Sequence, residues 1–483
     1  MSENQIEAQV RAFVPFLAAL VLGTVVLFAT GVLNDPDTYW HLATGGWILD
    51  HGRVPHVDVF SYTKAGAPWV AHEWLSDVLM ALAYRAGGWS GLVVLFATAA
   101  GAAAWLLVRR LSFALGGITL LLVSVLAIAG MLPSLLARPQ LFMLPVLLLW
   151  VGELMTAREQ HRAPRLAAAL LMTLWANLHG SFVFGFLLAG AFGLDALVEE
   201  KGRRWSVIRD WGLFAAAITA AALLTPHGIQ GLIYPFQIMH MTILPYIIEW
   251  RPADFSQPTT FEAAILVTLF VCLSRGVRMR IVPLLLLLGL LHMSLQHIRH
   301  QLVLVMVAPL ILAEPLARAL GQQHASRPAL RPLFVTTVAV LTAVLFAVRL
   351  AMPLTRPDGP ISPVTALAHV PPELAAQPVF NDYGFGGYLI FKGVRPFIDG
   401  RSDMYGDAFS GDYFRADRFD RPLFKTLLQR YRVAWSILPP NSKLIPLLDE
   451  AGWQRIYADR YAVVQRRPTP AGVPLKTPPT PAR

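Results

Sequence analysis

NDPDTYWHLATGGWILDHGRVPHVDVFSYTKAGAPWVAHEWLSD occupies residues 34–77 and directly follows residues 13–33, an uncharged run long enough to span a membrane. Pro36 disfavours helical geometry at Asp35, so Asp35 and Asp37 can converge from an extended turn. Two neighbouring carboxylates can bind a divalent cation such as Mg²⁺ or Mn²⁺, or one can act as a general base. The alternative is that they only cap a helix, although capping requires just one of them.

A helix is expected from about Thr38 to Asp50, with Asp37 as its capping residue. Asp37 and His41 are four residues apart and share one face, so His41 is either a partner of Asp37 or a plain interfacial histidine. Trp40 and Trp47 lie on another face, and tryptophan rings favour membrane interfaces. The pattern predicts an amphipathic helix on a membrane surface.

The composition places the whole chain in the membrane-protein class. Of its 483 residues 55% are hydrophobic and only 14% are charged, which is more apolar than a soluble domain. The net charge of +10 does not indicate nucleic-acid binding, because the basic residues are scattered among apolar runs. Cys272 is the single cysteine, which excludes an intrachain disulfide and a cysteine-based zinc site.

Further apolar runs predict about eleven transmembrane helices in all, several of them shorter than the roughly 20 residues that a bilayer prefers. Lysine and arginine collect on alternate loops, which places those loops and the N-terminus in the cytoplasm. After residues 13–33 the runs are 88–108, 111–130, 139–155, 163–178, 181–198, 211–225, 261–274, 281–296, 302–318 and 333–353.

Unusual polar residues gather at the opposite, outer ends of the predicted helices. Ionisable groups at membrane depth usually face a bundle interior, so a common location indicates one substrate-binding site, unless these loops are simply polar. Arg299 and Arg138 are suited to hold phosphate, the alternative being arginines that snorkel to the interface. The candidates for substrate binding are His41, His72, Glu73, Arg138, His179, His227, Glu249, His297, Arg299 and His300.

Two short patterns within this set carry weaker information. His72-Glu73 begins like the zinc-protease signature, but Ser76 stands where the second histidine is required, so zinc binding is not predicted. Glu249 and Arg251 flank Trp250 and are expected to form an ion pair that braces their loop.

From residue 355 the composition becomes that of a soluble domain. The expected divisions are a transmembrane domain over 1–354, which includes the first outer loop 34–87, an external α/β domain over 355–467, and a disordered tail over 468–483. The α/β domain should have β-rich segments at 378–391, 394–399, 433–438 and 455–465 and helices near 422–432 and 443–451.

Two glycine-containing stretches of this domain, 381–387 and 399–403, are turn-like and lack the spacing of a phosphate loop. They are either structural or face the substrate. In the second case Asp382, Tyr383 and Arg401 would lie on the acceptor side.

A first span, an outer loop that opens with Asp35-x-Asp37, about ten further helices and an outer C-terminal domain together resemble the GT-C superfamily of integral-membrane glycosyltransferases. The segment Asp35-Pro36-Asp37-Thr38-Tyr39-Trp40-His41 resembles openings found in bacterial membrane proteins of this type. Asn381-Asp382-Tyr383-Gly384 is similar to the Trp-Trp-Asp-Tyr-Gly motif of oligosaccharyltransferases, but both tryptophans are absent.

The resemblance implies a GT-C-like helical membrane protein of the bacterial inner membrane, with its C-terminal domain in the periplasm. It further implies that Asp35 or Asp37 activates an acceptor hydroxyl on a glycan, lipid or protein, which attacks a sugar carried on polyprenyl phosphate, with inversion. A transporter or flippase of lipid-linked glycans and a non-catalytic envelope assembly protein are the alternatives. A transporter more often places its polar residues near mid-bilayer.

Overall fold

A computed structural model describes residues 3–322 and 332–468 and divides the chain into two compact units. Unit 1 comprises residues up to Leu33, His72–Met239 and Leu244–Leu354. Unit 2 comprises Asn34–Ala71, His240–Ile243 and the residues from Thr355 onward. The expected disordered tail lies outside the described residues from residue 469 onward.

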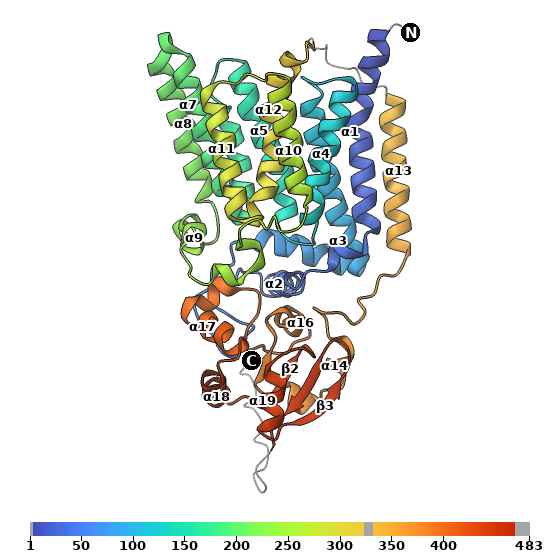
Figure 1. Cartoon of the computed structure of the whole chain (residues 1–483), viewed down its shortest axis with the longest axis vertical. Coiled ribbons are helices and arrows are strands. Elements are labelled where there is room, and N and C mark those ends of the chain that lie inside the picture. The colour runs from blue at the N-terminus through green and yellow to red at the C-terminus, as the bar shows by residue number, and fades with distance from the viewer. Residues whose placement is uncertain (1–2, 323–331, 469–483) are drawn as a thin grey trace. The chain divides into compact units, whose positions relative to one another are not determined.

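Unit 1 is a helical bundle whose helices lie side by side in Figure 1. Each of the predicted apolar runs is helical. The helices are α1 (Glu3–Phe28), α3 (Trp74–Leu111), α4 (Gly117–Met131), α5 (Gln140–Glu159), α6 (Ala169–Leu178), α7 (Val183–Glu199), α8 (Arg204–Ala222), α9 (Ile229–Met239), α10 (Thr260–Ser274), α11 (Ile281–Gln296), α12 (Gln301–Ala319) and α13 (Pro332–Ala351).

Length and composition qualify many of these helices as membrane spans. Of the described helices, seven are long and apolar enough to cross a bilayer and three more are apolar but shorter. Helix α8, for which a span was predicted, is in neither group. The chain is therefore a multi-pass membrane protein, and the number of eleven spans stays a prediction.

Helix α3 has two parts because Gly87 and Gly88 leave helical geometry, Gly88 with a positive φ of 57°. The part before this bend crosses the ends of other helices of the bundle (Figure 1). The second part packs along α1 through small residues. A Cβ at Gly101 would lie 3.2 Å from the carbonyl oxygen of Ala19, so glycine allows the two backbones to approach closely.

Unit 2 is an α/β unit built on a four-stranded mixed sheet with the order β1-β2-β4-β3. Strand β1 is parallel to β2, whereas β4 is antiparallel to both β2 and β3. The strands are β1 (Val379–Asn381), β2 (Trp435–Leu438), β3 (Gln454–Ala458) and β4 (Val463–Arg466), and the helices are α2 (Asp37–His51), α14 (Val364–Ala368), α15 (Pro372–Ala375), α16 (Gly386–Phe391), α17 (Ser402–Asp417), α18 (Arg421–Arg430) and α19 (Leu444–Glu450).

The prediction of a helical polytopic membrane protein with a small C-terminal α/β domain is confirmed, but two of its β-rich segments are wrong. Most of 378–391 is helical, since only β1 is a strand and α16 follows it. Segment 394–399 forms no named strand. Its backbone instead bonds to side chains, because Asn381 donates to Ile398 O at 2.8 Å and accepts from Phe397 N at 2.7 Å, while Thr63 Oγ1 donates to Phe397 O at 2.7 Å. An amide side chain thus takes the place of a strand partner.

The first loop contributes to the core of unit 2, whereas the sequence groups it with the transmembrane domain. Trp40 and Trp69 are buried in the same hydrophobic cluster as Phe397 and Tyr405. The expectation that Trp40 meets a membrane interface is therefore wrong, because its ring is inside unit 2. Residues separated by more than 300 positions build this core together.

Candidate functional site

The acidic turn of unit 2 consists of Asp35, Pro36 and Asp37 at the start of α2. Asp35 is only 2% exposed, and its Oδ1 accepts the backbone N–H of Asp37 at 2.8 Å. The N-cap position of α2 is Pro36 and carries no side-chain cap, so the expectation that Asp37 caps the helix is wrong, and Asp37 is instead the first helical residue. Asp37 is half-buried, and its Oδ1 accepts the indole N–H of Trp40 at 3.0 Å. One carboxylate supports the turn, and the second is held by a neighbouring ring.

Glycines of the C-terminal part of unit 2 form a cradle around this turn. A Cβ at Gly387 would lie 2.3 Å from the carbonyl oxygen of Pro36, and a Cβ at Gly400 would lie 1.9 Å from Asp37 Oδ1. Both distances are too short for any side chain. Gly386 is equally restricted, because its Cβ would lie 2.2 Å from Ile398 O. The two turn-like stretches therefore share a role, which is to let the acidic turn approach the backbone closely.

His41 lies one helical turn after Asp37 and is 2% exposed. Its ring packs on the ring of Trp40, with a centroid distance of 3.6 Å. The indole that binds Asp37 is thus also in contact with His41. This places His41 behind the carboxylate in the packing of unit 2.

The acceptor-side candidates of unit 2 have different surroundings. Arg401 is 1% exposed and bonds to Asp399 and to Asp58 Oδ1 at 2.8 Å, with its guanidinium carbon 4.7 Å from the ring centroid of Trp69. Asp399 and Asp58 raise its pKa further despite burial. These contacts give Arg401 a structural role, and we leave it out of the proposed substrate contacts.

Asp382 and Tyr383 sit at the edge of the glycine cradle. Asp382 Oδ1 accepts the N–H of Gly384 at 2.8 Å, and burial raises the pKa of this carboxyl to about 6. The Tyr383 hydroxyl lies 2.9 Å from Ser402 Oγ and donates to Gly400 O at 3.3 Å. Tyr383 therefore braces the backbone of the glycine that contacts Asp37.

Unit 1 contains a second group of candidates, which we call the Arg/His cluster. Glu73 lies 3.3 Å from His179 Nε2 and 3.7 Å from His72 Nε2. Arg138 pairs with Glu249 at 2.6 Å. The cluster is defined as His72, Glu73, Arg138, His179, Glu249 and Arg299, and it brings together residues that the sequence spreads over more than 220 positions.

The charges in the Arg/His cluster act on one another. Burial alone would raise the pKa of Glu249, but Arg138 and Arg299 outweigh it and the pKa is lowered. The guanidinium of Arg299 lies over the ring of Trp250, 4.2 Å from its centroid. The expected Glu249–Arg251 ion pair is wrong, because Glu249 pairs with Arg138 and Arg251 donates to the carbonyl oxygens of Pro245 and Tyr246.

Three further candidate histidines are not members of the Arg/His cluster. His297 Nδ1 lies 2.7 Å from Trp250 O, and the rings of His297 and His300 meet edge to face at 5.3 Å. They support the loop that carries Arg299. His227 is buried beside Gly231 at the turn before α9, and we define the cluster without it.

Sequence reasoning missed the roles of Gly387, Gly400 and Trp250. Their types gave a signal, since glycine indicates close backbone approach and an aromatic residue beside an arginine indicates a cation–π contact. Within residues 3–322 and 332–468, no three histidine, cysteine or acidic residues are grouped to hold a metal ion. A cation on Asp35 and Asp37 would therefore need ligands from substrate or water, and it stays a prediction.

Comparison with known proteins gives one structural relationship. No family model matches the chain, and no curated protein matches it. The chain is similar to the crystal structure of the apo oligosaccharyltransferase of Archaeoglobus fulgidus, with a TM-score of 0.50 and 11% sequence identity, over 87% of this chain and 69% of that one. At this identity the likeness concerns the fold. Together with the apolar helices it shows that the chain is a multi-pass membrane protein with the GT-C-like fold.

Proposed function

We propose that this protein is a membrane glycosyltransferase that moves a sugar from a polyprenyl-phosphate donor to an acceptor hydroxyl. The observation that carries the proposal is the acidic turn, where a half-buried carboxylate, Asp37, is fixed at the start of α2 on a GT-C-like fold. Fold alone does not assign an activity, so the assignment rests on this carboxylate and on the Arg/His cluster.

Asp37 is assigned as the general base. It accepts the proton of the acceptor hydroxyl, whose oxygen forms a bond to the anomeric carbon of the sugar. The bond between that carbon and the phosphate oxygen breaks, and its electron pair leaves with the polyprenyl phosphate. A single displacement of this kind inverts the anomeric centre. Asp35 holds the backbone of Asp37 in place through the Asp37 N–H.

A phosphate leaving group requires positive charge more than it requires a proton, and unit 1 supplies two candidate arginines. Arg138 already pairs with Glu249 at 2.6 Å. The guanidinium carbon of Arg299 lies over the Trp250 ring, 4.2 Å from its centroid, and a guanidinium can donate paired N–H groups to phosphate oxygens. We therefore assign the donor phosphate to Arg299, with Arg138 and the neighbouring histidines His72 and His179 as secondary contacts.

A lipid-linked donor is favoured over a nucleotide sugar. The chain has no glycine-rich phosphate motif, and the longest predicted cytoplasmic loop, 319–332, is too short for a nucleotide-binding domain. We place the reaction on the periplasmic side of a bacterial inner membrane, following the lysine and arginine asymmetry. An alkaline phosphatase fusion near residue 360 should be active and one near residue 204 inactive. The reverse pattern would contradict this orientation.

The decisive experiment offers purified protein polyprenyl-phosphate sugars and nucleotide sugars in parallel. Asp37→Asn keeps the hydrogen bond from Trp40 but removes the base, so transfer should fall by about 100-fold or more. The matched control is Asp50→Asn, on the exposed end of the same helix, which should retain wild-type rates. Turnover of nucleotide sugars alone, or full activity of Asp37→Asn, would refute the proposal.

The assignment of the donor phosphate to Arg299 is tested by comparing two arginine-to-lysine variants. Arg299→Lys keeps the charge but loses the planar fork, so the KM for the donor should rise while the KM for the acceptor stays the same. Arg251→Lys is the control, because Arg251 lies in the same region and donates only to loop carbonyls in the contacts described. Equal effects of both substitutions would contradict phosphate binding by Arg299.

A further inference from the structure

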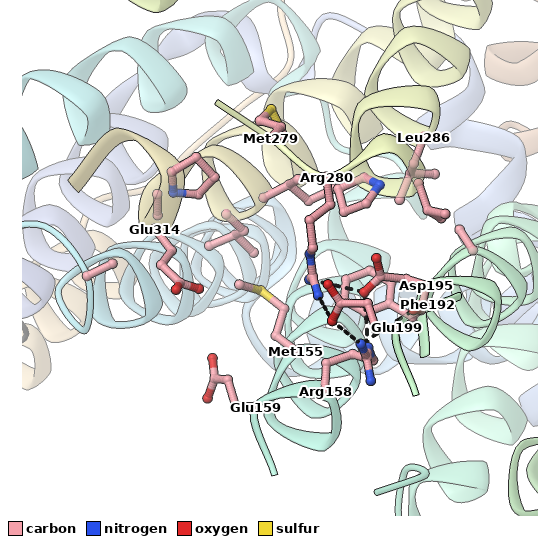
Figure 2. Close-up of a pocket in the computed structure, with 18 of the residues that line it drawn as sticks. Met155, Arg158, Glu159, Phe192, Asp195, Glu199, Met279, Arg280, Leu286 and Glu314 are labelled. Atoms are coloured by element: carbon pink, nitrogen blue, oxygen red, sulfur yellow. Dashed lines mark hydrogen bonds and ion pairs between the residues drawn. The ribbon is translucent and has the colours of Figure 1, made fainter. Parts of the chain in front are cut away.

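A cavity of about 630 Å³ lies in unit 1, bordered by the C-terminal ends of α3, α5, α7 and α12 and the N-terminal end of α11 (Figure 2). Arg138 lies two residues before α5, whereas Arg158 of the cavity lies in its last turn. With a rise of about 1.5 Å per residue, the twenty-residue α5 separates this cavity from the Arg/His cluster by roughly 30 Å. The cavity is therefore a separate site at the opposite end of the bundle.

One wall of the cavity is an ion-pair network. Figure 2 shows Arg158 and Arg280 converging on Asp195 and Glu199. Arg158 Nε lies 3.0 Å from Asp195, and Arg280 lies 3.0 Å from Asp195 and also pairs with Glu199. Arg158 has a side chain only 6% exposed, and its Nη1 lies 3.6 Å from a Glu200 carboxylate oxygen, without a hydrogen bond to the residues that the structure describes. The Arg158 guanidinium thus belongs to the ion-pair wall and keeps an N–H group that can donate to a ligand.

The remaining charges form two looser pairs. Arg318 and Glu314 are 4.0 Å apart and 61% and 52% exposed, so each is open to another partner. Arg110 pairs with Glu159, which is itself 55% exposed. Glu159 and Glu314 lie apart from the Arg158 network in Figure 2. The rim of the cavity thus carries arginines and carboxylates that lie apart from the Arg158 network.

The lining limits the class of ligand. Four arginines and four carboxylates line the cavity, so their formal charges cancel and a ligand of one sign has no net attraction. Apolar side chains such as Phe113, Met155 and Leu310 complete the lining. The cavity sits where apolar helices end, which in a bilayer is the depth of the lipid headgroups. The balanced charges, the apolar lining and the depth in the bilayer together fit a molecule that has an apolar body and a headgroup with one positive and one negative charge.

We propose that this cavity binds the headgroup of a zwitterionic phospholipid that carries a primary ammonium, as in phosphatidylethanolamine. Its phosphate accepts N–H donors from Arg318 and Arg158, which both line the cavity. Its ammonium donates to Glu314 and Glu159. The acyl chains remain in the bilayer, where exposed leucines of α11 such as Leu285 and Leu288 meet lipid.

The test measures which phospholipid stays bound to detergent-purified full-length protein by native mass spectrometry. Phosphatidylethanolamine should be retained over phosphatidylcholine, whose ammonium has no N–H, and over anionic phosphatidylglycerol. Arg318→Ala combined with Glu314→Ala should weaken retention of phosphatidylethanolamine by about ten-fold, because two charge-assisted contacts are lost. Both residues are exposed, so the variant is expected to fold.

The matched control is Arg209→Ala combined with Asp210→Ala, which removes an exposed ion pair on α8 outside the cavity. It should bind phosphatidylethanolamine as the wild type does. Retention of phosphatidylcholine or phosphatidylglycerol as strong as that of phosphatidylethanolamine would overturn the proposal, as would equal behaviour of the two double variants. Competition by soluble glycerophosphoethanolamine at the same concentration would show a water-soluble ligand instead and would overturn the lipid assignment.

Discussion

Unit 2 contains two pairs of aspartates whose hydrogen-bond donors differ. One pair is Asp58 and Asp399, and the other is Asp35 and Asp37. Asp58 and Asp399 are buried on either side of Arg401, which bonds to both. Asp35 accepts a backbone N–H and Asp37 accepts an indole N–H, and glycine backbones approach this turn closely. The guanidinium ties two buried carboxylates into the core of unit 2, whereas the N–H donors of the acidic turn orient its carboxylates at the start of α2.

Both groups of carboxylates belong to one unit because they share the segment Asp399-Gly400-Arg401. Asp399 and Arg401 form the ion-pair group, while Gly400 contacts Asp37. Tyr405 strengthens this junction by donating to Asp399 Oδ2 at 2.7 Å. The structural group thus fixes the backbone on which the candidate base rests.

The largest effect is expected from Arg401→Met. It leaves Asp58 and Asp399 as uncompensated buried charges, so unit 2 should lose about 3–5 kcal/mol of stability. Melting temperature and limited proteolysis measure this loss. Arg415→Met, which removes an exposed ion pair with Asp412, is the control and should cost less than about 1 kcal/mol. Similar losses in the two variants would show that the buried group is not structural.

Gly400→Ala should have the next largest effect, because its Cβ would overlap Asp37 Oδ1. Relief of the overlap should cost about 1–3 kcal/mol and move the carboxylate, so transfer activity should fall more than the melting temperature indicates. Gly411→Ala is the control, since a Cβ there meets no atom within 4 Å. Wild-type activity in Gly400→Ala would mean that this contact does not position Asp37.

A smaller loss is expected from Asp35→Ala, which removes the acceptor for the Asp37 N–H. The cost should be about 0.5–2 kcal/mol, the range found when a side-chain acceptor is removed from an N–H group at a helix start. Asp35→Asn keeps an acceptor oxygen and should restore stability, while transfer stays severely reduced in both variants because the negative charge is lost. Thermal unfolding and transfer rates distinguish the two effects. Full activity of Asp35→Asn would show that Asp35 only accepts the Asp37 N–H and that its negative charge has no part in transfer.

The smallest effect concerns the pH dependence of stability at Asp382. Burial raises the pKa of Asp382 from 3.8 to about 6, so the native state binds this proton more tightly than the unfolded chain does. Its contribution to stability is fully present below about pH 4 and is lost as the pH rises through about 6. Asp382→Asn should remove this component from a plot of melting temperature against pH. An unchanged plot would contradict the raised pKa.

Much of the fold is predictable because its signals are local. An apolar run must form a helix to satisfy its backbone in lipid, and the predicted apolar runs are all helical. The helix expected over 38–50 is α2, over 37–51. Helix α16 was missed, since it begins with Gly386 and Gly387, which disfavour helices locally and are retained for close backbone approach.

The candidate site was predictable only in part. The polar residues at the ends of separate helices predicted the Arg/His cluster, because ionisable groups at membrane depth usually face the bundle interior and pair with one another. Partners within the cluster were not predictable, as Arg138 pairs with Glu249 across 111 positions while the nearby Arg251 does not. Sequence distance carries no information on which of several like charges a folded bundle brings together.

The sequence by itself determined that the chain is a membrane protein, where its helices run, and that Asp35 and Asp37 form a turn before α2, because these depend on hydropathy and local backbone chemistry. Only the tertiary structure decided that residues 34–71 pack with residues 355 onward, that Arg401 is buried between two carboxylates, and that Gly400 contacts Asp37. These features depend on side chains more than 300 residues apart, whose contacts are set by packing of the whole unit.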